Sequence, residues 1–155
     1  MPLIDPSAYE PGERARALLN HVRGSWLPYS AVYILTHATS RWYADDRFVG
    51  ECMSGLAGHG GAVRMWVDWK KAAEYAAHDR TASPCDRAVL RLVSALALNR
   101  PVDLPPFLGE MDDQAARAVF AGLAFLSRSE TLHQELDDCG GPTLSGVPLC
   151  AEDAA

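Results

Sequence analysis

The chain of 155 residues is poor in features that would assign it to a functional class. Only two of its 14 basic residues are lysines, Lys70 and Lys71, and its net charge is −6. Tight binding to nucleic acid regardless of sequence rests on many phosphate contacts from basic side chains, so it is not the first expectation for an acidic chain. The first residues have no basic segment followed by an apolar stretch, so we expect no secretory signal peptide.

Long hydrophobic runs and paired cysteine motifs are also missing. The longest uncharged run, residues 24–40, is shorter than a membrane span and contains Pro28 and His37, so we expect no membrane segment. None of the four cysteines has C-x-x-C spacing. With neither a signal peptide nor a membrane segment expected, we expect a cytoplasmic protein, in which the cysteines are reduced thiols; a labile bridge between Cys139 and Cys150 is the alternative for that pair.

The composition that is present is typical of one globular domain. Hydrophobic residues make up 48% of the chain and charged residues 22%, and the bias toward arginine and alanine indicates a bacterial source. The charge is uneven, because residues 1–100 hold 12 basic and 10 acidic residues, whereas residues 101–155 hold 2 and 10. We expect an extended N-terminal arm over 1–11, a single all-α domain over 12–137 and a flexible acidic C-terminal tail over 138–155.

Apolar residues recur at spacings of three and four along most of the chain, which predicts helices. Helices are predicted over 13–22, 29–43, about 45–56, 62–78, 84–98, 113–127 and 129–136, with the third either separate from the second or continuous with it. Ser83-Pro84-Cys85-Asp86 is the clearest local signal, with a Ser cap, proline at the first helical position and an acid at the third. No stretch shows sustained alternation with β-branched residues, so we expect no sheet and a compact, all-α bundle of about six helices.

Two of these segments, 84–98 and 113–127, are apolar around most of their circumference. We expect them to form a central αα-hairpin, with alanine and Gly122 allowing close helix approach. So small a chain has few partners to cover two such helices, which favours a second subunit on one of them.

Gly58-His59-Gly60-Gly61 predicts a tight turn that requires positive φ. Backbone N–H groups in such a loop can also hold a phosphate, but the lysine of a phosphate-binding loop and a preceding strand are missing from the predicted pattern. The turn is therefore the preferred interpretation.

Candidate metal ligands occur as carboxylate and imidazole pairs on predicted helices. Glu130 and His133 have the Glu-x-x-His spacing of carboxylate-bridged metal sites, and Glu74 and His78 lie four residues apart. A complete site of that type needs further ligands, so the alternative is that these are polar residues on the solvent-facing sides of amphipathic helices. We expect no cofactor.

Nine of the 13 aromatic residues fall between residues 26 and 75, interleaved with basic residues. Aromatic rings stack on bases and arginine binds phosphate, so this pattern allows a nucleic-acid-binding face. Its candidate contacts are Arg41, Arg47, Arg64, Lys70 and Lys71. The simpler interpretation is that aromatic residues at helical spacing form the core.

The sequence therefore favours a non-enzymatic protein-interaction module that binds another protein or itself, the latter as a homo-oligomer. A nucleic-acid-associated accessory protein that uses residues 23–80 is the alternative, and a small helical-bundle metal protein or enzyme is the third. No nucleophile motif such as G-x-S-x-G is present to favour an enzyme.

Overall fold

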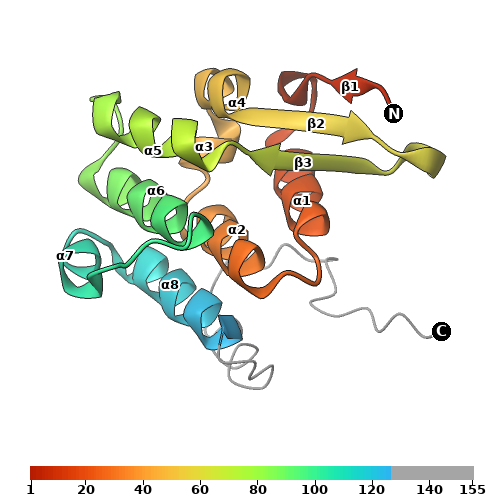
Figure 1. Ribbon diagram of the computed structural model, residues 1–155. Helices are drawn as coiled ribbons and strands as arrows, with labels where there is room; N and C mark the ends of the chain where they lie inside the picture. Colours follow the sequence, from red (N-terminus) through yellow and green to blue (C-terminus); the bar gives the residue numbers. More distant parts are fainter. Residues whose placement is uncertain (127–155) are drawn as a thin grey trace.

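A computed structural model describes residues 1–126 of the chain, which are mostly helical and carry a small sheet (Figure 1). The predictions for Glu130, His133, Cys139, Cys150, the helix over 129–136 and the tail over 138–155 lie outside the described residues. The first half contains β1 (Leu3–Ile4), η1 (Pro6–Ala8), α1 (Pro11–His21), α2 (Trp26–Ala38), α3 (Arg41–Ala44), α4 (Asp46–Cys52) and β2 (Met53–Ala57). The second contains η2 (His59–Gly61), β3 (Val63–Val67), α5 (Trp69–His78), α6 (Pro84–Ala97), α7 (Leu104–Gly109) and α8 (Asp113–Leu126).

Helix α2 is the centre of the helical part, with α6 and α8 packed against it (Figure 1). Every residue from Tyr29 to Ala38 is buried. The prediction of a central hairpin formed by 84–98 and 113–127 is wrong in this respect, although both helices are present nearly at the predicted bounds. The uncharged run of residues 24–40 contains the central helix α2. A helix packed between two others has little surface in contact with water, so it needs few charged residues.

Close approach of α2 and α8 depends on Gly122, as its position in the sequence predicted. A Cβ atom at Gly122 would lie 2.5 Å from Cγ1 of Ile34. Because α2 covers one face of α6 and one face of α8 within a single chain, these helices do not require a second subunit to shield those faces. Phe120, on another face of α8, is 49% exposed.

The expectation of no sheet is wrong, because β1, β2 and β3 form an antiparallel sheet in that order. The predicted helix over 45–56 ends at Cys52, and the first residues of the predicted helix over 62–78 form β3 instead. Val63, Met65 and Val67 alternate along β3 and turn toward the core, with Met65 fully buried. Five residues are too few for this alternation to outweigh the helical spacing of their neighbours.

The glycine-rich loop is the turn of this β-hairpin, and it does not connect two helices. Gly60 and Gly61 adopt φ of 72° and 80°, which confirms the predicted need for positive φ. The N–H of Gly58 donates to the carbonyl of Ala62 at 2.6 Å and closes the hairpin. Helix α1 packs along β3, at the side of the sheet opposite β1 (Figure 1).

A buried arginine fastens the N-terminal segment to the helices. Arg14 of α1 is 3% exposed. It donates from Nε to the carbonyl of Pro6 at 2.9 Å and from its terminal nitrogens to the carbonyls of Ser7 and Tyr43 at 2.9 and 3.1 Å. It also forms an ion pair of 3.0 Å with Asp46. Residues 1–11, expected as an extended arm, thus hold β1 and η1, and Arg14 ties η1 to α1, α3 and α4.

Within residues 1–126, no helix is long and apolar enough to cross a membrane.

Candidate functional site

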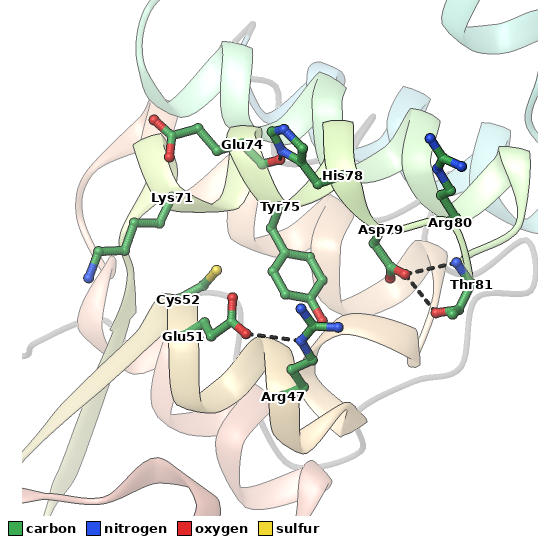
Figure 2. A pocket seen from close by; sticks show the side chains of 10 residues that line it. All are labelled: Arg47, Glu51, Cys52, Lys71, Glu74, Tyr75, His78, Asp79, Arg80 and Thr81. Atoms are coloured by element: carbon green, nitrogen blue, oxygen red, sulfur yellow. Dashed lines mark hydrogen bonds and ion pairs between the residues drawn. The ribbon is translucent and has the colours of Figure 1, made fainter.

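A groove of about 380 Å³ lies between α4 and α5 (Figure 2). The β-hairpin explains why these two helices are neighbours. It leaves the end of α4 and returns to the start of α5, and the N–H of Asp68 donates to the carbonyl of Cys52 at 2.7 Å. The lining residues are Arg47, Glu51, Cys52, Lys71, Glu74, Tyr75, His78, Asp79, Arg80 and Thr81.

Aspartate side chains fix the ends of both helices. Asp45 caps α4 by accepting from the N–H groups of Arg47 and Phe48, and Asp68 caps α5 by accepting from those of Lys70 and Lys71. Negative charge at a helix N-terminus also interacts favourably with the helix dipole. These caps fix the residue at which each helix starts, and therefore the helical positions of the charged residues that line the groove.

At the floor of the groove, the ring of Tyr75 packs against aromatic side chains that are buried behind it. Tyr75 reaches from α5 toward α4 (Figure 2), and its ring meets Phe48 edge-on at a centroid distance of 5.4 Å. Trp42 lies behind them, 6.0 Å from Tyr75 and 5.4 Å from Phe48. Such edge-to-face aromatic contacts add to the free energy of burial, so the floor holds α4 and α5 at a fixed spacing.

The walls, in contrast, consist of charged side chains in contact with water. Arg47 pairs with Glu51 at 3.0 Å, with side chains 74% and 53% exposed, and Lys71 lies 3.9 Å from Asp68 with side chains 63% and 47% exposed. Ion pairs at this exposure contribute little to stability, because water screens them and ordering the side chains costs entropy. These groups can therefore exchange their present partners for others at little cost.

Asp79 and its neighbours close one end of the groove. The Asp79 carboxylate accepts from the N–H of Thr81 at 2.9 Å and from its hydroxyl at 2.6 Å. These hydrogen bonds, with help from Arg41 at 3.4 Å, hold the pKa of Asp79 below its usual value. The carboxylate is therefore ionised throughout the neutral range.

The Cys52 thiol and the Tyr75 hydroxyl, at the floor of the groove, are protonated near neutral pH. In that state neither serves as a nucleophile or a general base. Burial raises the pKa of the Cys52 thiol to about 12, with Glu51 and Asp68 adding to the effect. Burial also raises the pKa of the Tyr75 hydroxyl, and the charges of Asp45 and Asp79 act in the same direction. A reactive cysteine needs the opposite surroundings, because the thiolate is the nucleophile.

The structure separates the five basic residues proposed to contact nucleic acid. Arg47 and Lys71 line the groove, but acidic residues stand between them. Arg41 is engaged, with ion pairs to Asp45 and Asp79 and a hydrogen bond to Thr81. Lys70 lies outside the groove lining, and Arg64 is exposed on β3, opposite Leu56. Of the five, only Arg47 and Lys71 line the groove.

Glu74 and His78 do lie together in the groove, on successive turns of α5 (Figure 2). Nδ1 of His78 lies 2.7 Å from the carbonyl of Glu74, so this ring nitrogen is engaged by the backbone of its own helix. Within residues 1–126, no group of three potential ligands is close enough to hold a metal ion. Glu74 and His78 alone do not complete a metal site, and the Glu-x-x-His pair of Glu130 and His133 lies outside the described residues.

Sequence reasoning missed the groove because it did not place α4 beside α5. Lys71, Glu74, Tyr75 and His78 have the i, i+3, i+4 and i+7 spacing of one helix face, and Arg47 and Glu51 have that of an ion pair on a helix. The spacing in the sequence therefore indicates each wall of the groove separately. The contact between the halves depends on the β-hairpin, which was not predicted.

Comparison with protein-family models, with characterised proteins and with solved structures gives no match to this chain.

Proposed function

We propose that the protein is a non-enzymatic interaction module that binds another protein through the groove between α4 and α5. The observation that carries this proposal is the construction of the groove, in which exposed side chains of both charges surround Tyr75, whose ring packs on the buried Phe48. Arg47, Lys71 and Arg80 provide positive charge, and Glu51, Glu74 and Asp79 provide negative charge. A second protein surface of complementary mixed charge matches such walls.

Binding without chemistry is supported by the state of the polar groups at the floor. The raised pKa values of Cys52 and Tyr75 keep both side chains protonated near neutrality. Both described cysteines, Cys52 and Cys85, are free thiols, which is consistent with the cytoplasmic setting that we infer.

The acids among the walls favour a protein partner over a nucleic acid. A phosphate backbone bound in the groove would lie beside the exposed carboxylates of Glu51 and Glu74, which repel it and offset part of the attraction of the three cations. On a protein partner, each of these carboxylates can instead meet a lysine or an arginine.

A photo-crosslinking amino acid placed at position 74 tests the proposal in extracts of cells that produce the protein. We expect an adduct of defined mass, because Glu74 lines the groove. The same probe at position 70 provides the matched control, since Lys70 is exposed on α5 without lining the groove. Adducts that are identical for the two positions would contradict the proposal.

Charge reversal then tests the role of the walls. Lys71→Glu combined with Arg80→Glu is expected to weaken the crosslinked complex at least about tenfold, and Lys70→Glu is expected to leave it unchanged. Formation of the complex in all three proteins alike would exclude the groove as its contact surface. A complex lost on nuclease treatment would favour the nucleic-acid alternative.

A further inference from the structure

We propose that two copies of the chain pair through the outer edge of β1 and form a continuous six-stranded sheet. This proposal is independent of the groove, because it uses β1 and the adjacent strand β2, whose residues do not line the groove. It follows from the direction of the backbone groups of this edge strand and from the exposure of its side chains, and its partner is a second copy related by a two-fold axis.

The register of the sheet determines which backbone groups point outward. Ile4 lies opposite Gly55, Leu3 lies opposite Leu56, and the N–H of Ala57 donates to the carbonyl of Pro2 at 3.1 Å. Antiparallel strands alternate between residues whose N–H and C=O face one neighbour and residues whose groups face the other. The groups of residues 2 and 4 therefore face β2, and those of Leu3 point away from it.

The same alternation directs the carbonyl of Met1 and the N–H of Asp5 outward. No strand of the described residues lies on that side, because β1 is the first strand of the sheet. Figure 1 shows β1 at the margin of the molecule, whereas α1 lies along β3 at the other side. An unpaired strand edge with free donors and acceptors is a template for another strand.

Each copy has four outward-facing backbone groups, which are the N–H and C=O of Leu3, the C=O of Met1 and the N–H of Asp5. A two-fold axis at Leu3 gives all four a hydrogen-bond partner. The two copies of Leu3 then exchange both hydrogen bonds with each other, and Met1 of each copy accepts from Asp5 of the other. Pro2 does not interfere, because its missing N–H is on the side that faces β2. Prolines are tolerated in edge strands in that orientation, so the register at Leu3 loses no hydrogen bond to proline.

Exposure of the side chains supports the same register. Leu3 and Met1 are 78% and 77% exposed, the two highest values among the large hydrophobic residues described. Leu3 lies beside the half-buried Leu56 in the adjacent strand. Pairing at Leu3 places the two leucines against each other and extends this apolar row across the dimer. The contact is short, so we expect a weak dimer with Kd on the order of 100 µM.

Two variants with opposite charges at position 3 test both the β1–β1 contact and its register. The measurement is sedimentation equilibrium of the full chain over a concentration series. We expect the wild-type protein to dimerise, and Leu3→Lys and Leu3→Glu to be monomers because like charges then meet at the axis. An equimolar mixture of the two variants is expected to regain dimers. Arg64→Glu is the control, since Arg64 is exposed on β3, the strand farthest from β1, and should leave dimerisation unchanged.

Three results would overturn the proposal. A wild-type chain that stays monomeric at all soluble concentrations would exclude the dimer. Dimers of Leu3→Lys as strong as those of the wild type would show that the contact lies elsewhere. Failure of the mixed variants to associate, with circular dichroism confirming that both are folded, would contradict the two-fold register at Leu3.

Discussion

The helical part around α2 and the N-terminal part around the sheet are held together in different ways. Between α2, α6 and α8 the contacts are mainly apolar, and side chains such as Ile34, Leu90 and Leu92 are fully buried. Around the sheet, polar bonds join segments far apart in the sequence, as when Arg14 binds Tyr43 and Asp46. Apolar packing leaves a periodic trace in the sequence, whereas one arginine with several distant acceptors leaves none.

The largest effect is expected from a charge placed in the helical part. Leu92→Asp should unfold the protein, because Leu92 is 0% exposed in α6 and the aspartate would have no partner. The cost, roughly 5 kcal/mol, approaches the whole stability of a domain. Circular dichroism and thermal melting measure this loss, with Arg91→Ala as the exposed control on the same helix. A folded Leu92→Asp protein would show that this helix is less tightly enclosed than described.

Loss of the central polar contact of the N-terminal part is expected to cost somewhat less. Arg14→Ala leaves the carbonyls of Pro6, Ser7 and Tyr43 without their donor and should lower the free energy of unfolding by about 3 kcal/mol. Urea denaturation gives the value, and Arg16→Ala, which removes an exposed arginine from the same helix, should have little effect. Equal effects of the two substitutions would mean that the polar contacts do not secure this part.

A glycine-to-alanine substitution in each part compares how well the two parts accommodate an added methyl group. Gly122→Ala should destabilise by about 2 kcal/mol, because its Cβ would lie 2.5 Å from Cγ1 of the buried Ile34. Gly55→Ala should cost about 1 kcal/mol, because its Cβ meets Ile4 at 2.8 Å and that side chain, at the edge of the sheet, can move.

Denaturant unfolding of both variants ranks them, and Ile34→Val should recover part of the loss in Gly122→Ala. Gly50→Ala is the control, because nothing lies within 4 Å of its Cβ position. The reverse order, with Gly55→Ala costing more, would indicate that the sheet is the less adaptable of the two parts.

The smallest effect concerns the pH dependence of stability at the end of the groove. The pKa of Asp79 is lowered in the folded state by hydrogen bonds from Thr81. The carboxylate therefore stabilises the fold above its unfolded pKa, about 4, and this contribution is lost as pH falls through the lower folded-state pKa. We expect Asp79→Asn to be less stable than the wild type near neutrality and the difference to shrink in acid. Urea midpoints measured from neutral to acidic pH test this, and a difference independent of pH would contradict it.

Much of the helical part was predictable, and half of the groove with it. The cap at Ser83, the bounds of α6 and α8 and the small residue at Gly122 all follow from local rules of helix formation and packing. On α5, the sequence predicts Lys71 as part of a basic pair with Lys70, and Glu74 with His78 as a pair of metal ligands, but it does not predict that Lys71, Glu74 and His78 form one wall of a groove. The opposite wall, from Arg47 to Cys52, was assigned to a helix that continued past its end.

The sequence by itself determined that the described chain is mostly helical, that Gly60 and Gly61 form a turn and that Ser83 starts a helix. Each of these depends on neighbours within a few residues. Only the tertiary structure decided that α2 is central, that residues 53–67 form a β-hairpin and that α4 and α5 flank a groove. These features depend on contacts between distant segments, whose free energies outweigh the weak local preferences of short strands.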